Sequence, residues 1–505
     1  MRYVMTSAPK RLAALAALAT LVGCAKQSDK SATDSPAATA ASGDVATNAK
    51  VPITSTSEEA RALYAKGRDF TEQLRTQEAR KLFEQAVAKD STFALAHYNL
   101  ALSSASPKDF FEHLKHAVAL ADKASEGERL LILGLQANAN ADQPKALQYA
   151  EELVAKYPQD ERAHFNLANQ YGGRQQNDKA IAEYQKAIQI NPNYSIAYNA
   201  LGYAYRAADN NAEAETAFKK YIELVPNDPN PYDSYAELLM KLGRFDESIE
   251  QYRKALSVDP NFSSSNIGIA ANLMFQGKPD AAVAEAQKLY DAAQDDGVRR
   301  NALTTQAIIY TDAWKTAQAL QRLEQVDGLG KKAADTAAMS FTAVTIGDVL
   351  LEAGRPAEAR ARYDKASALV NGSSASAEVK EDVKLGDHYN KARVALATND
   401  LATAKSEATE YLKGAEAKQN DFRTRQAHLL NGVIANREKR FDDAIGELAK
   451  SSAQDPYVIY QTAVAYQGKG DAAKAKQLAQ QAADANILPA FNYAFVRAKA
   501  KKLAQ

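Results

Sequence analysis

Apolar residues of contrasting size recur at fixed places along the chain, with a period of 34 residues marked by Pro158, Pro192, Pro226 and Pro260. Placing these prolines at position 32 of a unit makes seven units begin at Ala60, Ala94, Gly127, Glu161, Ser195, Pro229 and Ser263. Position 8 is small in every unit: Gly67, Ala101, Gly134, Ala168, Gly202, Ala236 and Ala270. Position 20 is small in six: Ala79, Ala146, Ala180, Ala214, Ser248 and Ala282. Because only a small side chain lets two helices cross closely, the pattern predicts stacked helix pairs.

Large rings complete this pattern at position 24, where they are placed to seal the stack: Phe83, Tyr184, Phe218 and Tyr252. The whole set resembles the tetratricopeptide repeat, whose W-x2-L-G-x2-Y, A-x3-F and terminal Pro pattern has its clearest copy in Tyr198, Leu201, Gly202, Tyr205, Ala214, Phe218 and Pro226. The resemblance implies an all-α solenoid of helix-turn-helix repeats in a right-handed superhelix. We expect roughly ten to twelve helix pairs, with the regular array over residues 57–295.

Beyond residue 295 the register loosens while similar residues persist. We expect degenerate repeats over 296–380 and further repeats over 381–505, closed by a capping helix near Pro489–Gln505 that covers the last apolar face. Two longer connections, Asp291–Arg300 and Asn371–Lys380, favour a kink or a division of the stack at those points.

The first residues predict an exported chain. Three basic residues, Arg2, Lys10 and Arg11, precede an apolar stretch, Leu12–Val22, which is too short to span a bilayer and is typical of a signal peptide over 1–23. The stretch ends in Leu-Val-Gly-Cys at Cys24, which resembles a bacterial lipobox and implies cleavage before Cys24 and acylation of that residue. The alternative is that Cys24, the single cysteine of the chain, is a small hydrophobe of an ordinary signal sequence. Ala25 after the cysteine favours, by the same resemblance, the periplasmic face of an outer membrane.

Residues 24–56 are mainly Ala, Ser, Thr, Asp and Lys, so we expect a disordered, lipid-anchored tether that buries too little apolar surface to fold. Removal of 1–23 takes away three of the 62 basic residues and none of the 62 acidic ones, which leaves a formal charge near −3. Such a balance gives no bulk attraction to nucleic acid or to anionic lipid. The lipid is therefore the expected contact with a membrane.

The sequence offers little for catalysis, and we expect no enzyme, no metal and no cofactor. Four histidines, His97, His164, His388 and His428, occupy position 4 of their units, where the family places a packing ring. His113 and His116 lie three residues apart on a predicted helix and could share a face as metal ligands, but no third ligand is suggested by local spacing.

The first helix of each pair lines the concave wall of such a stack, and the family exposes positions 2, 5, 6, 9, 12 and 13 there. These positions give the candidate binding residues Tyr98, Asn99, Arg162, Phe165, Asn166, Asn169, Asn199, Tyr203, Arg206, Asp233, Glu237 and Lys241. Amides donate to and accept from a peptide backbone, and rings and arginine add flat contact area. The alternative is that the rings pack between units and that the asparagines belong to a solvated helix face.

We therefore expect a protein-protein interaction scaffold in the bacterial envelope that binds extended polypeptide segments, with envelope assembly or secretion as the candidate setting. A binding module for cell-surface polysaccharide is the alternative, because rings and amides also bind sugars. An enzyme with an unrecognised site within 296–400 is a third hypothesis, although Trp314 and His388 in that region are expected to be packing residues.

Overall fold

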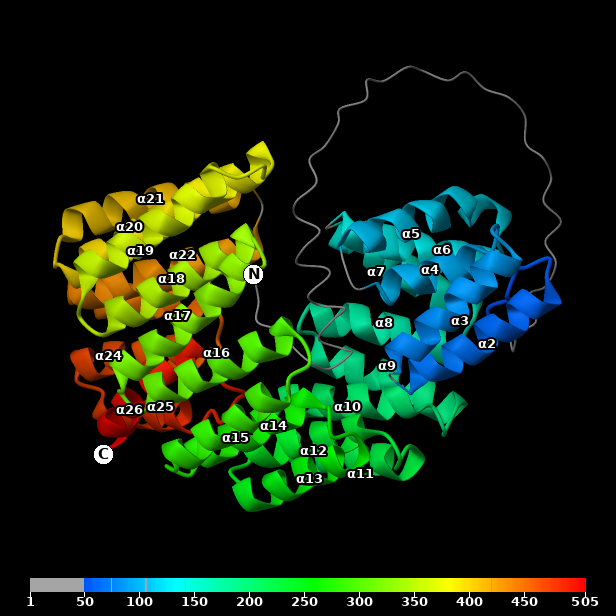
Figure 1. Cartoon of the computed structure of the whole chain (residues 1–505), viewed down its shortest axis with the longest axis horizontal. Helices are drawn as coiled ribbons and strands as arrows, with labels where there is room; N and C mark the ends of the chain where they lie inside the picture. Colours follow the sequence, from blue (N-terminus) through cyan, green and yellow to red (C-terminus); the bar gives the residue numbers. More distant parts are fainter. Residues whose placement is uncertain (1–49, 74, 105–106, 141, 419) are drawn as a thin grey trace. The chain divides into compact units, whose positions relative to one another are not determined.

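The computed structural model describes residues 50–505, apart from 74, 105–106, 141 and 419 (Figure 1). Within these ranges the chain forms 25 α-helices, one short 3-10 helix (Ala121–Lys123) and no strand. The helices form twelve consecutive pairs and one final helix. This arrangement confirms the expected all-α solenoid. The expected signal peptide, Cys24 and most of the tether lie outside the described residues.

The chain divides into two compact units, which we call unit 1 (residues 1–238) and unit 2 (residues 239–505). The helices of unit 1 are α2 (Glu58–Glu72), α3 (Thr76–Lys89), α4 (Ala94–Leu102), α5 (Pro107–Leu120), α6 (Glu126–Ala139), α7 (Gln143–Lys156), α8 (Glu161–Gly173), α9 (Asn177–Ile190), α10 (Ser195–Ala207) and α11 (Asn211–Leu224). α12 (Pro229–Lys241) contains the division between the units.

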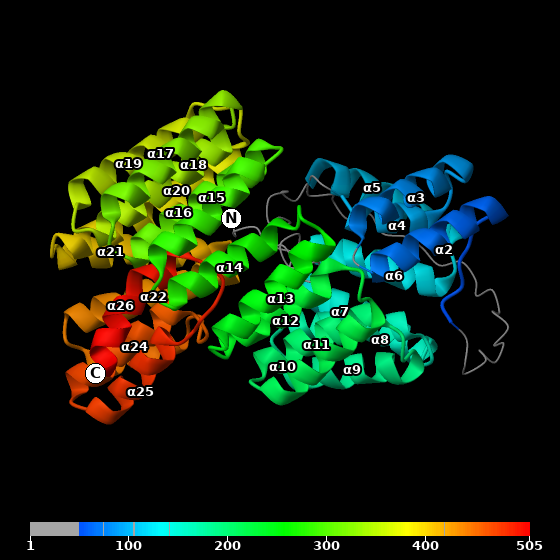
Figure 2. The same ribbon diagram turned by 60° about the horizontal axis from the view of Figure 1, so that its bottom comes forward.

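Unit 2 continues the series with helices that are coloured green to red in Figures 1 and 2. They are α13 (Phe245–Val258), α14 (Ser263–Phe275), α15 (Pro279–Ala292), α16 (Asp296–Asp312), α17 (Thr316–Lys332), α18 (Thr336–Glu352), α19 (Pro356–Asn371), α20 (Ala377–Ala397), α21 (Leu401–Ala417), α22 (Asp421–Arg437), α23 (Phe441–Ala449), α24 (Pro456–Lys469), α25 (Ala472–Ala483) and α26 (Phe491–Ala504).

Small residues at position 8 let the two helices of a pair meet, as the sequence predicts. A Cβ added to Gly202 of α10 would lie 2.6 Å from Cε1 of Phe218, the position-24 ring on α11. Gly347 of α18 has the same relation to Tyr363 of α19, at 2.5 Å. These separations are far below a normal van der Waals contact, so the ring at position 24 occupies the space that a larger residue at position 8 would need.

The turns within the pairs reverse the chain through a residue with positive φ. Glycine occupies this place at Gly243, Gly277, Gly354 and Gly470, with φ between 73° and 88°. Gln175 and Trp314 adopt the same conformation with φ of 60° and 58°, although a side chain disfavours it.

The looser register beyond residue 295 arises from longer helices and not from long connections. α14 has 13 residues, whereas α16 has 17 and α20 has 21. Of the two expected connections, residues 291–292 and 296–300 lie in α15 and α16, and residues 371 and 377–380 lie in α19 and α20. Asp295 and Ser376 are the N-caps of α16 and α20. The chain also divides inside α12, and not at either of the two expected points.

Residues 50–56 of the expected tether are ordered against unit 1, and we call them the N-terminal strap. The strap is extended, with alternate residues turned inward: Val51 packs with Leu130 and Tyr157, and Ile53 packs in the cluster around Phe93. Its backbone amides donate to carboxylates of three helix pairs: Val51 to Asp160 at 2.8 Å, Thr54 to Glu128 at 2.8 Å and Thr56 to Asp90 at 3.1 Å. The expectation of disorder is therefore wrong for these seven residues.

Candidate functional site

The candidate binding residues lie on the first helices of successive pairs. Tyr98 and Asn99 are on α4; Arg162, Phe165, Asn166 and Asn169 on α8; Asn199, Tyr203 and Arg206 on α10; and Asp233, Glu237 and Lys241 on α12. Eleven of the twelve belong to unit 1, because Lys241 lies beyond Leu238. The structure therefore places the candidate face on α4, α8, α10 and the first part of α12.

Two bonds join α10 to α12 across this face. Tyr203 donates its hydroxyl to Ser234 at 3.3 Å, and Arg206 forms an ion pair with Glu237 at 2.9 Å. Glu237 and Asp233 are almost fully buried, with 3% and 2% of their surface exposed. Burial also raises the pKa of Tyr203 far above its usual value. These side chains brace neighbouring repeats and balance one another's charge.

Arg162 ties α8 to a distant part of unit 1. Its guanidinium contacts the Glu72 carboxylate at 2.6 Å and that of Glu161 at 2.6 Å. Ser195, the first residue of α10, donates to the backbone oxygen of Glu72 at 3.0 Å. Burial raises the pKa of Glu72, and the nearby Arg162 opposes that change. The C-terminal end of α2 is therefore fixed against the N-terminal ends of α8 and α10.

Phe165 has the packing role given above as the alternative for the rings, and the asparagines of α8 lie close to it in the sequence. Phe165 packs between the rings of Tyr184 and Tyr194, with centroid distances of 5.6 and 5.5 Å. Asn169 accepts a hydrogen bond from the Tyr184 hydroxyl at 2.7 Å. Asn166 is half-buried beside them.

The candidates on α4 are interior residues as well. Asn99 is buried and donates to the Tyr64 hydroxyl at 3.0 Å and to the backbone oxygen of Leu95 at 3.0 Å. Tyr98 is half-buried against the apolar clusters around Phe93 and Ile132. This end of the candidate face therefore has few polar groups left for a ligand.

Asn199 differs from every other candidate. It lies on α10, one turn after Ser195, and has no exposed surface. Both polar atoms of its side chain, Oδ1 and Nδ2, lack a hydrogen-bond partner within the described part of the chain. Buried polar groups are nearly always paired, so Asn199 presents an unused donor and an unused acceptor side by side.

The four position-4 histidines are buried or half-buried, as expected of packing residues, and three of them also form a repeated bond that the sequence analysis missed. Nδ1 of His164, His388 and His428 donates to the glutamate 19 residues later, Glu183, Glu407 and Glu447, at 2.6, 2.6 and 2.8 Å. The recurrence of glutamate at that spacing was a usable signal. Trp314, by contrast, is 55% exposed, so its expected packing role is wrong.

The fourth of these histidines, His97, lies beside the pair that suggested a metal site. Its ring is 5.1 Å from that of His116 and 5.8 Å from that of His113. Even so, the described residues bring together no three His, Cys, Asp or Glu side chains that could hold a metal ion. The ring nitrogens Nδ1 of His97 and His113 are buried and have no partner in the same part of the structure.

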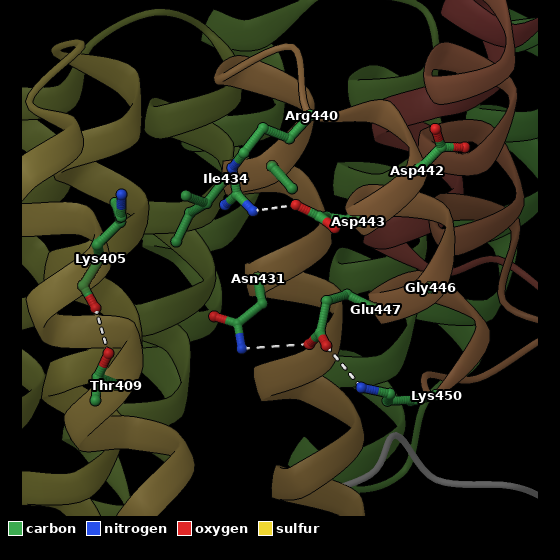
Figure 3. Close-up of a pocket in the computed structure, with 11 residues that line it drawn as sticks. Lys405, Thr409, Asn431, Ile434, Arg440, Asp442, Asp443, Gly446, Glu447 and Lys450 are labelled. Carbon is green, nitrogen blue, oxygen red and sulfur yellow. Dashed lines mark hydrogen bonds and ion pairs between the residues drawn. The ribbon is translucent and has the colours of Figure 1, made fainter. Parts of the chain in front are cut away.

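A cavity of about 530 Å³ in unit 2 lies between α21, α22 and α23 (Figure 3). The three cations on its wall are already paired: Lys405 with Glu438 at 2.8 Å, Arg440 with Asp443, and Lys450 with Glu447 at 2.8 Å. We assign no ligand to this cavity.

Of the helices in the described ranges, none is long and apolar enough to cross a membrane.

Comparisons with known proteins agree with the repeat pattern. Profiles described as tetratricopeptide repeat match residues 64–109, 196–228 and 229–262, and a profile described as TPR repeat matches 168–209. No functionally curated protein matches the chain.

Three solved structures illustrate the similarity. A tetratricopeptide repeat protein from Parabacteroides merdae is 18% identical over 57% of this chain and 99% of its own, with a TM-score of 0.34. TTC0263, a TPR protein of Thermus thermophilus, is 23% identical over 42% and 98%, with a TM-score of 0.28. YrrB, described as a TPR protein with an unusual peptide-binding site, is 18% identical over 38% and 97%, with a TM-score of 0.27. From its sequence matches, the chain carries tetratricopeptide repeats within residues 64–109 and 168–262, and its helix pairs form an all-α solenoid.

Proposed function

We propose that the protein is a non-enzymatic interaction scaffold that binds an extended polypeptide segment of a partner on the candidate face of unit 1. The observation that carries the proposal is Asn199, whose amide is buried with neither polar atom paired. A buried group left in this state costs about 1–3 kcal/mol. An extended peptide offers one N–H and one C=O per residue, which match the donor and the acceptor of this amide. Because Asn199 has no exposed surface, the proposal requires the side chains that cover it to move aside when the peptide binds.

The charges around Asn199 favour a main-chain ligand over a charged terminus. Arg206 is neutralised by Glu237, and Arg162 by Glu72 and Glu161. Neither arginine is therefore a free cation that could bind a carboxylate. The face offers hydrogen bonds to a backbone and does not offer a strong charge.

Polysaccharide binding has less support from the same residues. Sugar rings stack on aromatic faces that are open to solvent, and the rings on this face are engaged. Phe165 is held between two tyrosines, and Tyr203 packs edge-on against Phe218 at 5.2 Å. Tyr98 is also half-buried, so its ring is not fully open for stacking on a sugar.

The proposal places the scaffold in the bacterial envelope, held by lipid on Cys24 after removal of 1–23, on the periplasmic face of the outer membrane. It rests on the basic flank, the short apolar stretch and the lipobox-like end of that segment. Several acyl chains on one cysteine would anchor the protein firmly. Labelling of cells with a fatty-acid analogue tests this step: wild type should be labelled and fractionate with outer membrane, and Cys24→Ala should not be labelled.

The binding site is tested with the purified mature protein as bait for envelope proteins, in the wild type, Asn199→Leu and Asn193→Ala. Asn193 is an exposed turn residue and serves as the control. The Asn199→Leu variant should retain partners at least tenfold less well, which corresponds to about 1.4 kcal/mol. Its stability should be unchanged or higher, because an apolar side chain of similar shape removes two unpaired polar atoms. Equal retention by Asn199→Leu and Asn193→Ala would refute the assignment.

A further inference from the structure

The last helix, α26, packs in a different way from a simple cap. It contacts α25, as a capping helix should, but it also packs against α24 and against α16, which lies far earlier in the chain. Tyr493, Phe495 and Val496 of α26 are buried in one apolar cluster with Met274 and Phe275 of α14. The irregular segment 484–490 carries the chain from α25 to this position (Figures 1 and 2). The C-terminal helix therefore covers the first helices of several pairs in unit 2.

The C-terminal ends of three of these helices receive the cations of α26. Asp312, the last residue of α16, accepts from Arg497 Nε at 2.6 Å and also contacts its Nη2. The backbone oxygen of Met274, near the end of α14, lies 3.4 Å from Arg497 Nη2. Glu352, the last residue of α18, forms an ion pair with Lys499 at 2.8 Å. Helix C-termini carry partial negative charge. The carboxylates and the backbone carbonyls at this end of the surface therefore both favour the binding of cations.

An amide near the N-terminus of α26 makes a further polar contact. Asn492 Nδ2 donates to both oxygens of Asp455, each at 3.0 Å, and Asp455 is the N-cap of α24. Polar contacts of Asn492 and Arg497 thus flank the buried apolar residues of α26 on both sides. This pattern is that of a bound amphipathic helix, with apolar anchors and charged groups that set its direction.

Removal of α26 would expose the acidic side chains of this surface beside the apolar cluster. Asp312 is 8% exposed with α26 in place, and Arg497 is its ion-pair partner. Without α26, Asp312 would lose its ion-pair partner and the apolar side chains of the cluster would be exposed to water, which is unfavourable. The surface therefore needs an occupant that brings a cation next to apolar side chains.

We infer that the surface formed by α14, α16, α18 and α24 is a binding site for a basic amphipathic helix, and that α26 is its resident occupant. A partner helix that presents an arginine beside apolar residues would compete for the same place. This inference goes beyond the proposed function, because it concerns unit 2 and a helical ligand, and it does not depend on Asn199. The proposed function can fail while this inference stands.

The full mature chain tests the inference in the wild type, Arg497→Gln and Lys502→Gln. Lys502 is an exposed residue of α26 and serves as the matched control. In Arg497→Gln, amide hydrogen exchange in α26 should rise roughly 10²–10³-fold, the effect of breaking a buried ion pair. Exchange in α16 and α24 should stay as in wild type. A labelled peptide of residues 484–505 should bind Arg497→Gln and should not bind wild type or Lys502→Gln.

Trp314 supplies an independent readout. It is the single tryptophan of the chain, and Lys499 Nζ lies 5.7 Å from the centre of its ring. Release of α26 should change its fluorescence in Arg497→Gln, and addition of the peptide should restore it. A peptide that itself carries glutamine at position 497 should bind at least tenfold more weakly.

Two results would overturn the inference. In the first, α26 exchanges only together with α16 and α24, so that it is an inseparable part of the unit 2 core. In the second, α26 opens in Arg497→Gln but the peptide does not bind. If Arg497→Gln unfolds the whole of unit 2, this counts as the first result and against the inference. The milder variant Lys499→Gln checks that conclusion: its α26 should then also exchange only together with α16 and α24.

Discussion

Replacement of Gly347 by alanine tests the close crossing on which the repeat packing depends. Gly347 lies in α18, and a Cβ there would meet Tyr363 at Cε1, Cδ1 and Cζ, at 2.5, 2.8 and 3.0 Å. The ring cannot easily move, because Tyr363 is fully buried and its hydroxyl donates to Asp348 at 2.8 Å. Gly328, in the neighbouring α17, has nothing within 4 Å of its added Cβ and is the matched control.

The expected magnitudes follow from two opposing effects. Alanine is favoured over glycine inside a helix by about 1 kcal/mol, so Gly328→Ala should stabilise the protein by that amount. Overpacking a dense interior costs about 1–3 kcal/mol, so Gly347→Ala should lie between no net change and a loss of about 2 kcal/mol. The free energy of unfolding should therefore be about 1–3 kcal/mol lower in Gly347→Ala than in Gly328→Ala.

Urea unfolding can measure this difference with two probes. Circular dichroism follows all helices, and the fluorescence of Trp314 follows unit 2, where both glycines lie. The comparison requires the same dependence on urea in both variants, because a changed slope signals a different unfolding reaction. If Gly347→Ala proved as stable as Gly328→Ala, the crossing would not be as tight as the structure indicates.

Three further predictions address other features. Gln175→Gly should raise the free energy of unfolding by about 1 kcal/mol, because glycine adopts the positive φ of this turn without strain, and a higher urea midpoint would show it. Burial lowers the folded-state pKa of His97 and of His113 below 6.5, so their contribution to stability is complete above pH 6.5 and is lost as the pH falls below it. Urea midpoints at pH 7.5 and 5.5 should show this loss, and replacement of both histidines by phenylalanine should reduce it. Val51→Ala should speed amide exchange at Thr54 roughly fivefold by loosening the strap, since a half-buried valine contributes about 1 kcal/mol, and an unchanged rate would contradict the role of Val51.

The repeat pattern could be predicted from the sequence because it is local. The glycine or alanine at position 8 and the ring at position 24 lie within one pair, so a single period reveals both, as Gly202 and Phe218 show. The register beyond residue 295 was harder, because helices such as α20 are longer than those of the regular array. A change in helix length moves every later position and hides an unchanged packing rule.

The sequence predicts which helices carry the candidate residues but not how these residues are bonded. The candidate residues do lie on the first helices of their pairs, yet nothing in one unit shows that Arg206 meets Glu237 in the next. The shared spacing of 31 residues in this pair and in Tyr203–Ser234 is a signal that a search across units could use. The packing of α26 against α16 had no such signal, because Arg497 and Asp312 are 185 residues apart. Contacts of this kind depend on the three-dimensional path of the chain.

The N-terminal strap determines which helix pair of unit 1 would first bear a force that pulls on the N-terminal side of the chain. The strap begins with Lys50, which pairs with Glu161 at the start of α8, and then runs back past Glu128 and Asp90 to α2. A pull on the residues before Lys50 would thus act first beside the fourth helix pair, in the middle of unit 1. The ion pair and the hydrogen bonds along the strap would then be loaded in shear, all at the same time. The first pair would not be peeled away from the end of the stack, so an N-terminal anchor could hold this protein under tension without unravelling it.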